Sequence, residues 1–100
     1  MTAFTIHDVL AAARALVCVA PQDRLGVLEA MGAAADEAAW FLQRFSKYHA
    51  TLGNGTLEAV ARKRELAPLD FSNPEFCSAM AVVLNWRAAA LGALESDAEL

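Results

Sequence analysis

Alanine is so frequent in this chain that it limits the possible folds more than any other feature. The 100 residues include 23 alanines and 13 leucines, against seven valines and one isoleucine. Alanine and leucine lose little conformational freedom in a helix, whereas the β-branched residues that favour sheets are scarce. The composition therefore predicts an all-α fold.

The length and polarity of the chain bound its class. One hundred residues form a single domain with a modest core. Hydrophobic residues make up 57% and charged residues 20%, which excludes an intrinsically disordered chain. The apolar stretch 76–94 carries Asn85 and Arg87 near its middle, and a central arginine opposes membrane insertion. Because residues 1–4 also lack a basic signal-peptide start, we expect a soluble cytoplasmic protein with no membrane partner.

Two helices are predicted in the first half of the chain. Thr5 and Asp8 form a capping-box variant that begins a helix over residues 6–19, and Pro21 ends it. A second helix is expected over residues 22–48. Its apolar residues follow a heptad seam, which predicts near-antiparallel packing against a neighbouring helix: Leu28, Met31, Ala35, Ala38, Leu42, Phe45 and His49.

The second half begins with a turn and ends with a long helix. Gly53-Asn54-Gly55 consists of residues that tolerate positive φ, and Thr56 is a good N-cap for a short helix over residues 57–66. Asn73-Pro74-Glu75 is a strong start signal for a helix over residues 74–94. Because this last helix is apolar nearly all round, we expect it to be central in an irregular bundle of four helices, three long and one short.

The domain is expected to cover residues 1–94, with residues 95–100 as an acidic tail. Further short motifs are spread over most of this length: His49-Ala50-Thr51-Leu52-Gly53-Asn54-Gly55-Thr56-Leu57, Leu66-Ala67-Pro68, Asn73-Pro74-Glu75-Phe76, the alanine-rich stretch 11–16, and the acidic-Ala-Ala-Trp region 36–40. In these motifs the chain resembles a family of small uncharacterised helical proteins of alphaproteobacteria. The resemblance implies a bacterial origin and a helical domain, and it implies no activity.

Residues that commonly carry catalysis or bind metals are few. The two histidines, His7 and His49, belong to no zinc-binding spacing, and we expect both near helix ends. Cys18 and Cys77 lie in different segments without a C-x-x-C pattern, so we expect two buried free thiols. The sequence therefore predicts a non-catalytic protein without a metal or another cofactor.

Positive charge gathers between residues 44 and 64. The five basic side chains there are opposed by Glu58 alone, whereas the rest of the chain carries a net charge of −8: Arg44, Lys47, Arg62, Lys63 and Arg64. Together with Asn54 and Thr56, this segment is a candidate anion or nucleic-acid site, because free amides at a helix start bind anions. The overall net charge of −4 opposes nucleic-acid binding, and cations at a helix end also serve the helix dipole.

A second candidate surface centres on Trp40. On the predicted second helix Trp40 lies opposite the apolar seam, beside Glu37 and Arg44, and tryptophan is common at interfaces. Either the linker 68–73, the C-terminal tail or a partner could cover it. Trp86 belongs to the same candidate surface, from the last helix. Arg87 lies within an apolar face of that helix, which makes it a candidate for a buried ion pair with a carboxylate, or for an arginine whose head reaches the rim.

These observations favour a protein that acts through protein–protein contacts, with self-association as a homodimer expected first. The excess of hydrophobic residues in a small chain supports this interpretation, because a small domain cannot hide all of them. One alternative is phosphate or nucleic-acid binding through residues 44–64. Another is a small-molecule site or an enzyme near Trp40, His49 and Asn54.

Overall fold

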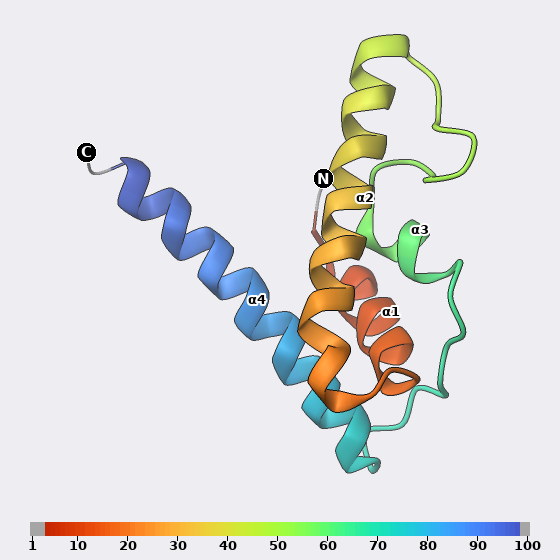
Figure 1. Ribbon diagram of the computed structural model, residues 1–100, viewed down its shortest axis with the longest axis vertical. Coiled ribbons are helices and arrows are strands. Elements are labelled where there is room, and N and C mark those ends of the chain that lie inside the picture. Colours follow the sequence, from red (N-terminus) through yellow and green to blue (C-terminus); the bar gives the residue numbers. More distant parts are fainter. Residues whose placement is uncertain (1–3, 99–100) are drawn as a thin grey trace.

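The structure, a computed structural model, describes residues 4–98, with side chains as far as residue 93. The described residues form four α-helices and a short 3-10 turn, and the α-helices are labelled in Figure 1. They are α1 (Ile6–Val17), η1 (Pro21–Asp23), α2 (Arg24–Phe45), α3 (Leu57–Ala61) and α4 (Pro74–Ala98). The described residues form no β-strand, so the all-α class with three long helices and one short helix is confirmed.

Local sequence signals place the helix starts well and the helix ends less well. The Thr5–Asp8 capping box begins α1, and Pro74 begins α4, both as predicted. The helix α2 stops at Phe45 rather than near residue 48, because Ser46 turns into the left-handed region at φ 57°. The helix α3 is shorter than predicted, and α4 continues past residue 94 to Ala98, so residues 95–98 of the expected acidic tail are helical.

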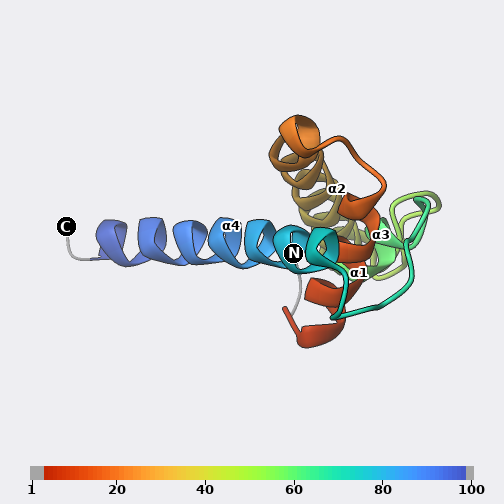
Figure 2. The ribbon, with the colours of Figure 1, turned by 90° about the horizontal axis from the view of Figure 1, so that it is seen from below.

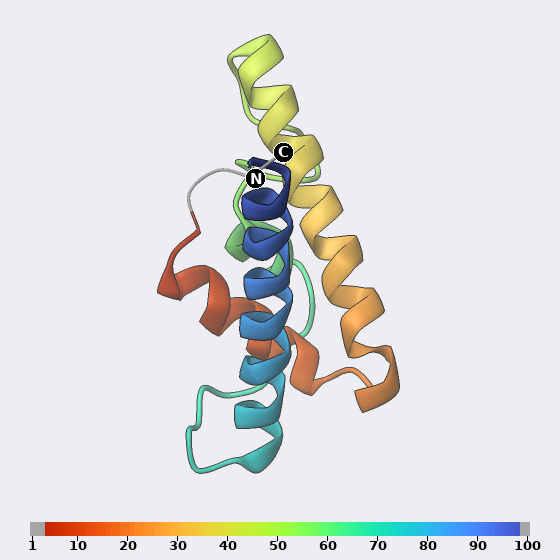
Figure 3. The ribbon, with the colours of Figure 1, turned by 90° about the vertical axis from the view of Figure 1, so that its left-hand side faces the viewer.

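The helix enclosed on most sides is α1, not α4. Alanines cover α1 on several faces, and Ala11, Ala12 and Ala13 are each at most 2% exposed. This row of small side chains lets α3 and α4 both approach α1 closely. In Figure 3, α1 crosses behind α4. The prediction of a central last helix is therefore wrong.

The helix α4 is buried over its first half only. Phe76, Ala79 and Val83 are fully buried on the side that faces α1. Figure 2 shows the C-terminal half of α4 leaving the rest of the molecule as a single projecting helix. Its apolar character is therefore only partly explained by the core of one chain.

The heptad seam of α2 reaches the core over half its length. Leu28, Met31, Ala35 and Ala38 are buried as predicted. Phe45, farther along the seam, is 50% exposed, because the C-terminal end of α2 extends beyond the other helices (Figure 1). The helix therefore packs through its N-terminal part.

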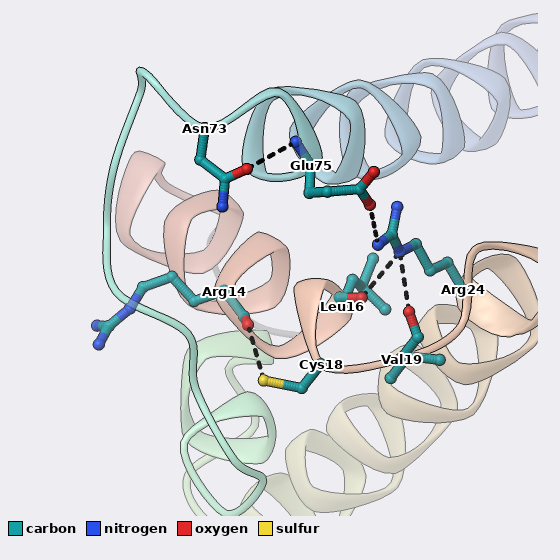
Figure 4. A network of polar contacts seen from close by, with 7 residues as sticks. All are labelled: Arg14, Leu16, Cys18, Val19, Arg24, Asn73 and Glu75. Atoms are coloured by element: carbon teal, nitrogen blue, oxygen red, sulfur yellow. Dashed lines mark hydrogen bonds and ion pairs between the residues drawn. The ribbon is translucent and has the colours of Figure 1, made fainter.

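A buried arginine connects three helices (Figure 4). The Nε of Arg24 donates hydrogen bonds to the carbonyl oxygens of Leu16 and Val19, at 2.9 and 3.1 Å, where α1 ends. Its other end forms an ion pair of 2.7 Å with Glu75 in the first turn of α4. Arg24 is 4% exposed and thereby links the end of α1 to the starts of α2 and α4.

Both cysteines are exposed, so the prediction of two buried thiols is wrong. Cys18 follows the end of α1, and Cys77 lies on the outer side of α4. Leu16, near Cys18, and Phe76, next to Cys77, are buried, because they face the core from other directions. A face that can be buried becomes buried only where another element covers it.

Candidate functional site

The Gly53-Asn54-Gly55 turn has the predicted conformation. Gly53 and Gly55 adopt φ angles of 88° and 90°. The Oδ1 of Asn54 accepts hydrogen bonds from the backbone N–H and the hydroxyl of Thr56. The Thr56 hydroxyl oxygen accepts in turn from the N–H of Ala59, which caps α3. The side chains of Asn54 and Thr56 are thus engaged in hydrogen bonds with each other and with the start of α3.

The start of α3 already holds a carboxylate from the same chain. Asp8, which is 2% exposed, accepts a hydrogen bond of 2.8 Å from the backbone N–H of Glu58. Its second oxygen accepts from the N–H and the hydroxyl of Thr5. One carboxylate therefore caps α1 and α3 together, in the place where the anion-site hypothesis expects an external anion.

The basic residues after α3 serve local contacts. Arg62 forms an ion pair of 2.9 Å with Glu58, one helical turn earlier. The Nζ of Lys63 donates to the backbone carbonyl of Thr51 and so ties α3 to the preceding loop. Arg64 is exposed beside Cys18. These contacts weaken the case for a phosphate or nucleic-acid site.

The neighbourhood of Trp40 is an exposed aromatic cluster at the end of α2. Trp40 is 58% exposed and packs edge to face against Phe45, which itself contacts Phe41. The Arg44 guanidinium lies 5.9 Å from the Phe45 ring centre, and a shallow hollow borders Trp40 and Arg44. The sequence hypothesis correctly places Trp40 away from the core.

The linker does not cover Trp40. Phe71 of the linker packs edge to face against Phe76 at the start of α4, and Leu69 remains 48% exposed. Residues 95–98 of the C-terminal tail continue α4 and lie away from the end of α2 (Figure 1). Within the described residues 4–98, the prediction that the linker or the tail covers Trp40 is therefore wrong.

His49 lies in the loop after α2 instead of at a helix end. Its ring contacts Phe41, and its Nδ1 accepts hydrogen bonds from the backbone N–H groups of Thr51 and Leu52. The ring therefore shapes the loop. His49 and Trp40 belong to one aromatic cluster, whereas the Asn54 side chain is engaged with Thr56. His7 is exposed in the first turn of α1, as expected.

Trp86 lies between α2 and α4. An added Cβ at Gly32 would be only 2.7 Å from the Trp86 ring, so the missing side chain of Gly32 lets the two helices meet. Trp86 also borders an apolar groove of about 430 Å³, whose lining further includes Leu25, Glu29, Val82, Asn85 and Ala89.

Among the residues that the structure describes, Arg87 forms no ion pair with a carboxylate, so the predicted buried ion pair is not found there. Its side chain is half-buried, and its guanidinium lies over the Phe4 ring at 4.7 Å from the ring centre. This is a cation–π contact. The deeply buried guanidinium of the fold belongs to Arg24, whose position at a helix start gives no sequence signal of burial.

An exposed apolar stripe on the outer side of α4 was not predicted from the sequence. Its residues are separated by alternating steps of four and three, so they share one face: Cys77, Ala81, Leu84, Ala88 and Leu91. All five are exposed, with Leu84 at 50% and Leu91 at 45%. The heptad spacing is visible in the sequence. Because the helix is apolar nearly all round, this spacing alone does not distinguish the exposed stripe from the core-facing residues.

The helix α4 has the length and composition of a membrane span over residues 74–93. Its buried half belongs to the folded body, where Glu75 pairs with Arg24 and Phe76 contacts the core. The remaining eleven residues, 88–98, span only about 16 Å as a helix, whereas a bilayer core is about 30 Å thick. Crossing a membrane would therefore require α4 to leave α1.

Comparison with known proteins gives one match. No curated protein and no solved structure matches the chain. Residues 3–87 match a family described as Domain of unknown function (DUF7742), and residues 88–93, which follow the matched region, are all exposed. This match agrees with the resemblance to an uncharacterised family. Since it covers well over half of the sequence, the chain belongs to the DUF7742 family.

Proposed function

We propose that this protein acts through protein–protein contacts and self-associates as a homodimer. The observation that carries the proposal is the exposed apolar outer side of α4, on a helix that extends beyond the body of the molecule. A contiguous exposed apolar patch is typical of a protein–protein contact surface. We further propose that the protein is bacterial and cytoplasmic and that it catalyses no reaction of its own.

The polar candidates support a structural role rather than chemistry. Asp8 and Thr56 satisfy helix starts, and Arg24 satisfies a helix end. Arg62 is paired within α3. We therefore propose a protein function that involves neither a cofactor nor a nucleic-acid partner.

The molar mass in solution tests the proposal directly. Light scattering or sedimentation equilibrium of the full chain, from about 5 to 200 µM, is expected to show a mass that rises from 10.7 kDa toward twice that value. A mass that stays at 10.7 kDa throughout this range contradicts self-association.

A further inference from the structure

The outer face of α4 carries a regular pattern of small and large residues. Ala81, Leu84, Ala88 and Leu91 alternate along it, and all four are exposed. Steps of three and four are the spacing of a coiled-coil seam, which keeps one stripe facing a partner helix. Val83 and the other core-facing residues lie on a neighbouring side of α4, with Val83 about 100° around the helix from Leu84.

We propose that this stripe pairs antiparallel with the same stripe of a second copy, with Leu84 of each copy opposite Ala88 of the other. This inference rests on the proposed self-association and specifies where and how it occurs. The same alignment places Ala81 opposite Leu91. A twofold axis then relates the two helices, as in most homodimers.

Packing selects the direction. In the antiparallel alignment each leucine faces an alanine, so large and small residues interdigitate along the seam. In a parallel alignment leucine would face leucine and alanine would face alanine, which leaves gaps at the alanine layers. Alanines opposite leucines also allow a close approach of the two helices.

Electrostatics selects the same direction. Glu95 and Asp97 belong to the last turn of α4. A parallel pair would bring two such acidic ends together, whereas an antiparallel pair separates them and opposes the two helix dipoles. It also lays the projecting half of each α4 along the buried half of its partner, where the body of the second copy stands.

The exposed area agrees with a missing partner. A compact monomer of this mass exposes about 5,500 Å², whereas this chain exposes 6069 Å². The projecting helix contributes to this larger area, and an interface near the lower limit of about 1,000 Å² needs about 500 Å² from each copy. We therefore expect a dimer of modest affinity, in exchange with the monomer at micromolar concentrations.

The decisive experiment compares Leu84→Glu with Leu69→Glu. Both leucines have nearly equal exposure, at 50% and 48%, but Leu69 lies in the linker and outside the stripe. In sedimentation equilibrium, Leu84→Glu is expected to raise the dimer dissociation constant by at least about tenfold, because each dimer loses two buried leucines. Leu69→Glu is expected to leave it unchanged, and circular dichroism should show equal helicity in both variants.

The outcomes separate the two proposals. A wild-type chain that stays monomeric overturns the self-association and the seam together. A wild-type dimer that Leu84→Glu leaves intact keeps self-association and overturns the seam. A monomer that instead co-sediments with vesicles of neutral and anionic phospholipid, and loses this binding in Leu84→Glu, overturns a second copy as the occupant of the stripe.

Disulfide cross-linking tests the direction in a chain that carries Cys18→Ala and Cys77→Ala. A mixture of Ala81→Cys and Leu91→Cys chains is expected to form cross-linked dimers on mild oxidation, because the antiparallel seam places these positions opposite each other. Each variant alone is expected to stay largely uncross-linked. Efficient cross-linking of Ala81→Cys by itself would indicate a parallel pair and overturn the antiparallel seam.

Discussion

The close contact between α2 and α4 makes Gly32 the most informative position for a stability test. A Cβ added there would lie 2.7 Å from Cζ2 and 3.1 Å from Cη2 of Trp86. Ordinary carbon–carbon contacts are about 3.5–4.0 Å long, so the ring or the helix must shift by roughly 1 Å. The ring is also held by Phe4 at 6.5 Å between centres, which restricts its movement.

Two opposing terms set the expected size of the effect. Replacing a helical glycine by alanine stabilises a protein by about 0.5–1 kcal/mol, because the unfolded chain loses conformational freedom. Overpacking a filled site costs about 1–3 kcal/mol. We therefore expect Gly32→Ala to lower the free energy of unfolding by up to about 2.5 kcal/mol.

Gly26 provides the matched control on the same helix. An added Cβ at Gly26 meets no atom within 4 Å. Gly26→Ala is therefore expected to be neutral or stabilising by up to about 1 kcal/mol. Since the helix-propensity term is shared, the difference between the two variants isolates the contact with Trp86 at about 1–3 kcal/mol, or roughly 4–24 °C in Tm for a domain of this size.

Urea and thermal unfolding, followed by circular dichroism, measure this difference. Trp86→Leu completes a double-mutant cycle, and Gly32→Ala is expected to recover its favourable helix-propensity term in that background. If Gly32→Ala stabilises the wild-type chain as much as Gly26→Ala does, the ring moves aside without cost. The close approach would then contribute nothing to stability, and the reasoning would be refuted.

Four further outcomes are expected. Arg24→Met should lower the free energy of unfolding by about 2–3 kcal/mol in urea titrations, because carbonyls at the end of α1 lose their donor. Glu75→Gln should lower it by less than about 1 kcal/mol, because Glu75 is 59% exposed. Asp8→Ala should cost about 1–3 kcal/mol by the same measurement, because the starts of α1 and α3 lose one shared cap. Gly53→Ala should cost about 1–2 kcal/mol, because its φ is 88° and an added Cβ would meet Ala59 at 2.9 Å; an unchanged Tm would contradict that strain. Fluorescence anisotropy with labelled DNA at about 150 mM salt should show no sub-micromolar complex; a tight complex that Lys63→Ala weakens would restore the nucleic-acid hypothesis.

The features predicted correctly from the sequence depend on residues close together in the chain. Thr5 and Asp8 are three positions apart, and their reciprocal contact needs only the first turn of a helix. The positive φ angles of Gly53 and Gly55 follow from turn chemistry in the same way. Such local signals decide where helices begin, and three of the four starts agree closely with the structure.

The features predicted wrongly depend on which element covers which face. Arg24 is buried because Glu75, 51 positions away, meets it at the start of α4. The Trp40 surface stays open because Phe71 packs on Phe76 and takes the linker to the other end of the molecule. Periodicity identifies a face that can be buried, but it contains no information on the position of a distant segment.

The central helix is α1 rather than the predicted α4, and the reason is side-chain size rather than hydrophobicity. Ranking helices by apolar character places α4 at the centre, since it carries Phe76, Trp86 and several leucines. A helix enclosed on several sides must let its neighbours approach within about 8–10 Å, and alanine permits this where larger residues do not. The alanines of α1 meet this requirement, so α1 occupies the centre and α4 packs against it through one face. Within the described part of the chain, the outer face of α4 is then left apolar and exposed, and this is the face that carries the alternating alanines and leucines of the proposed seam.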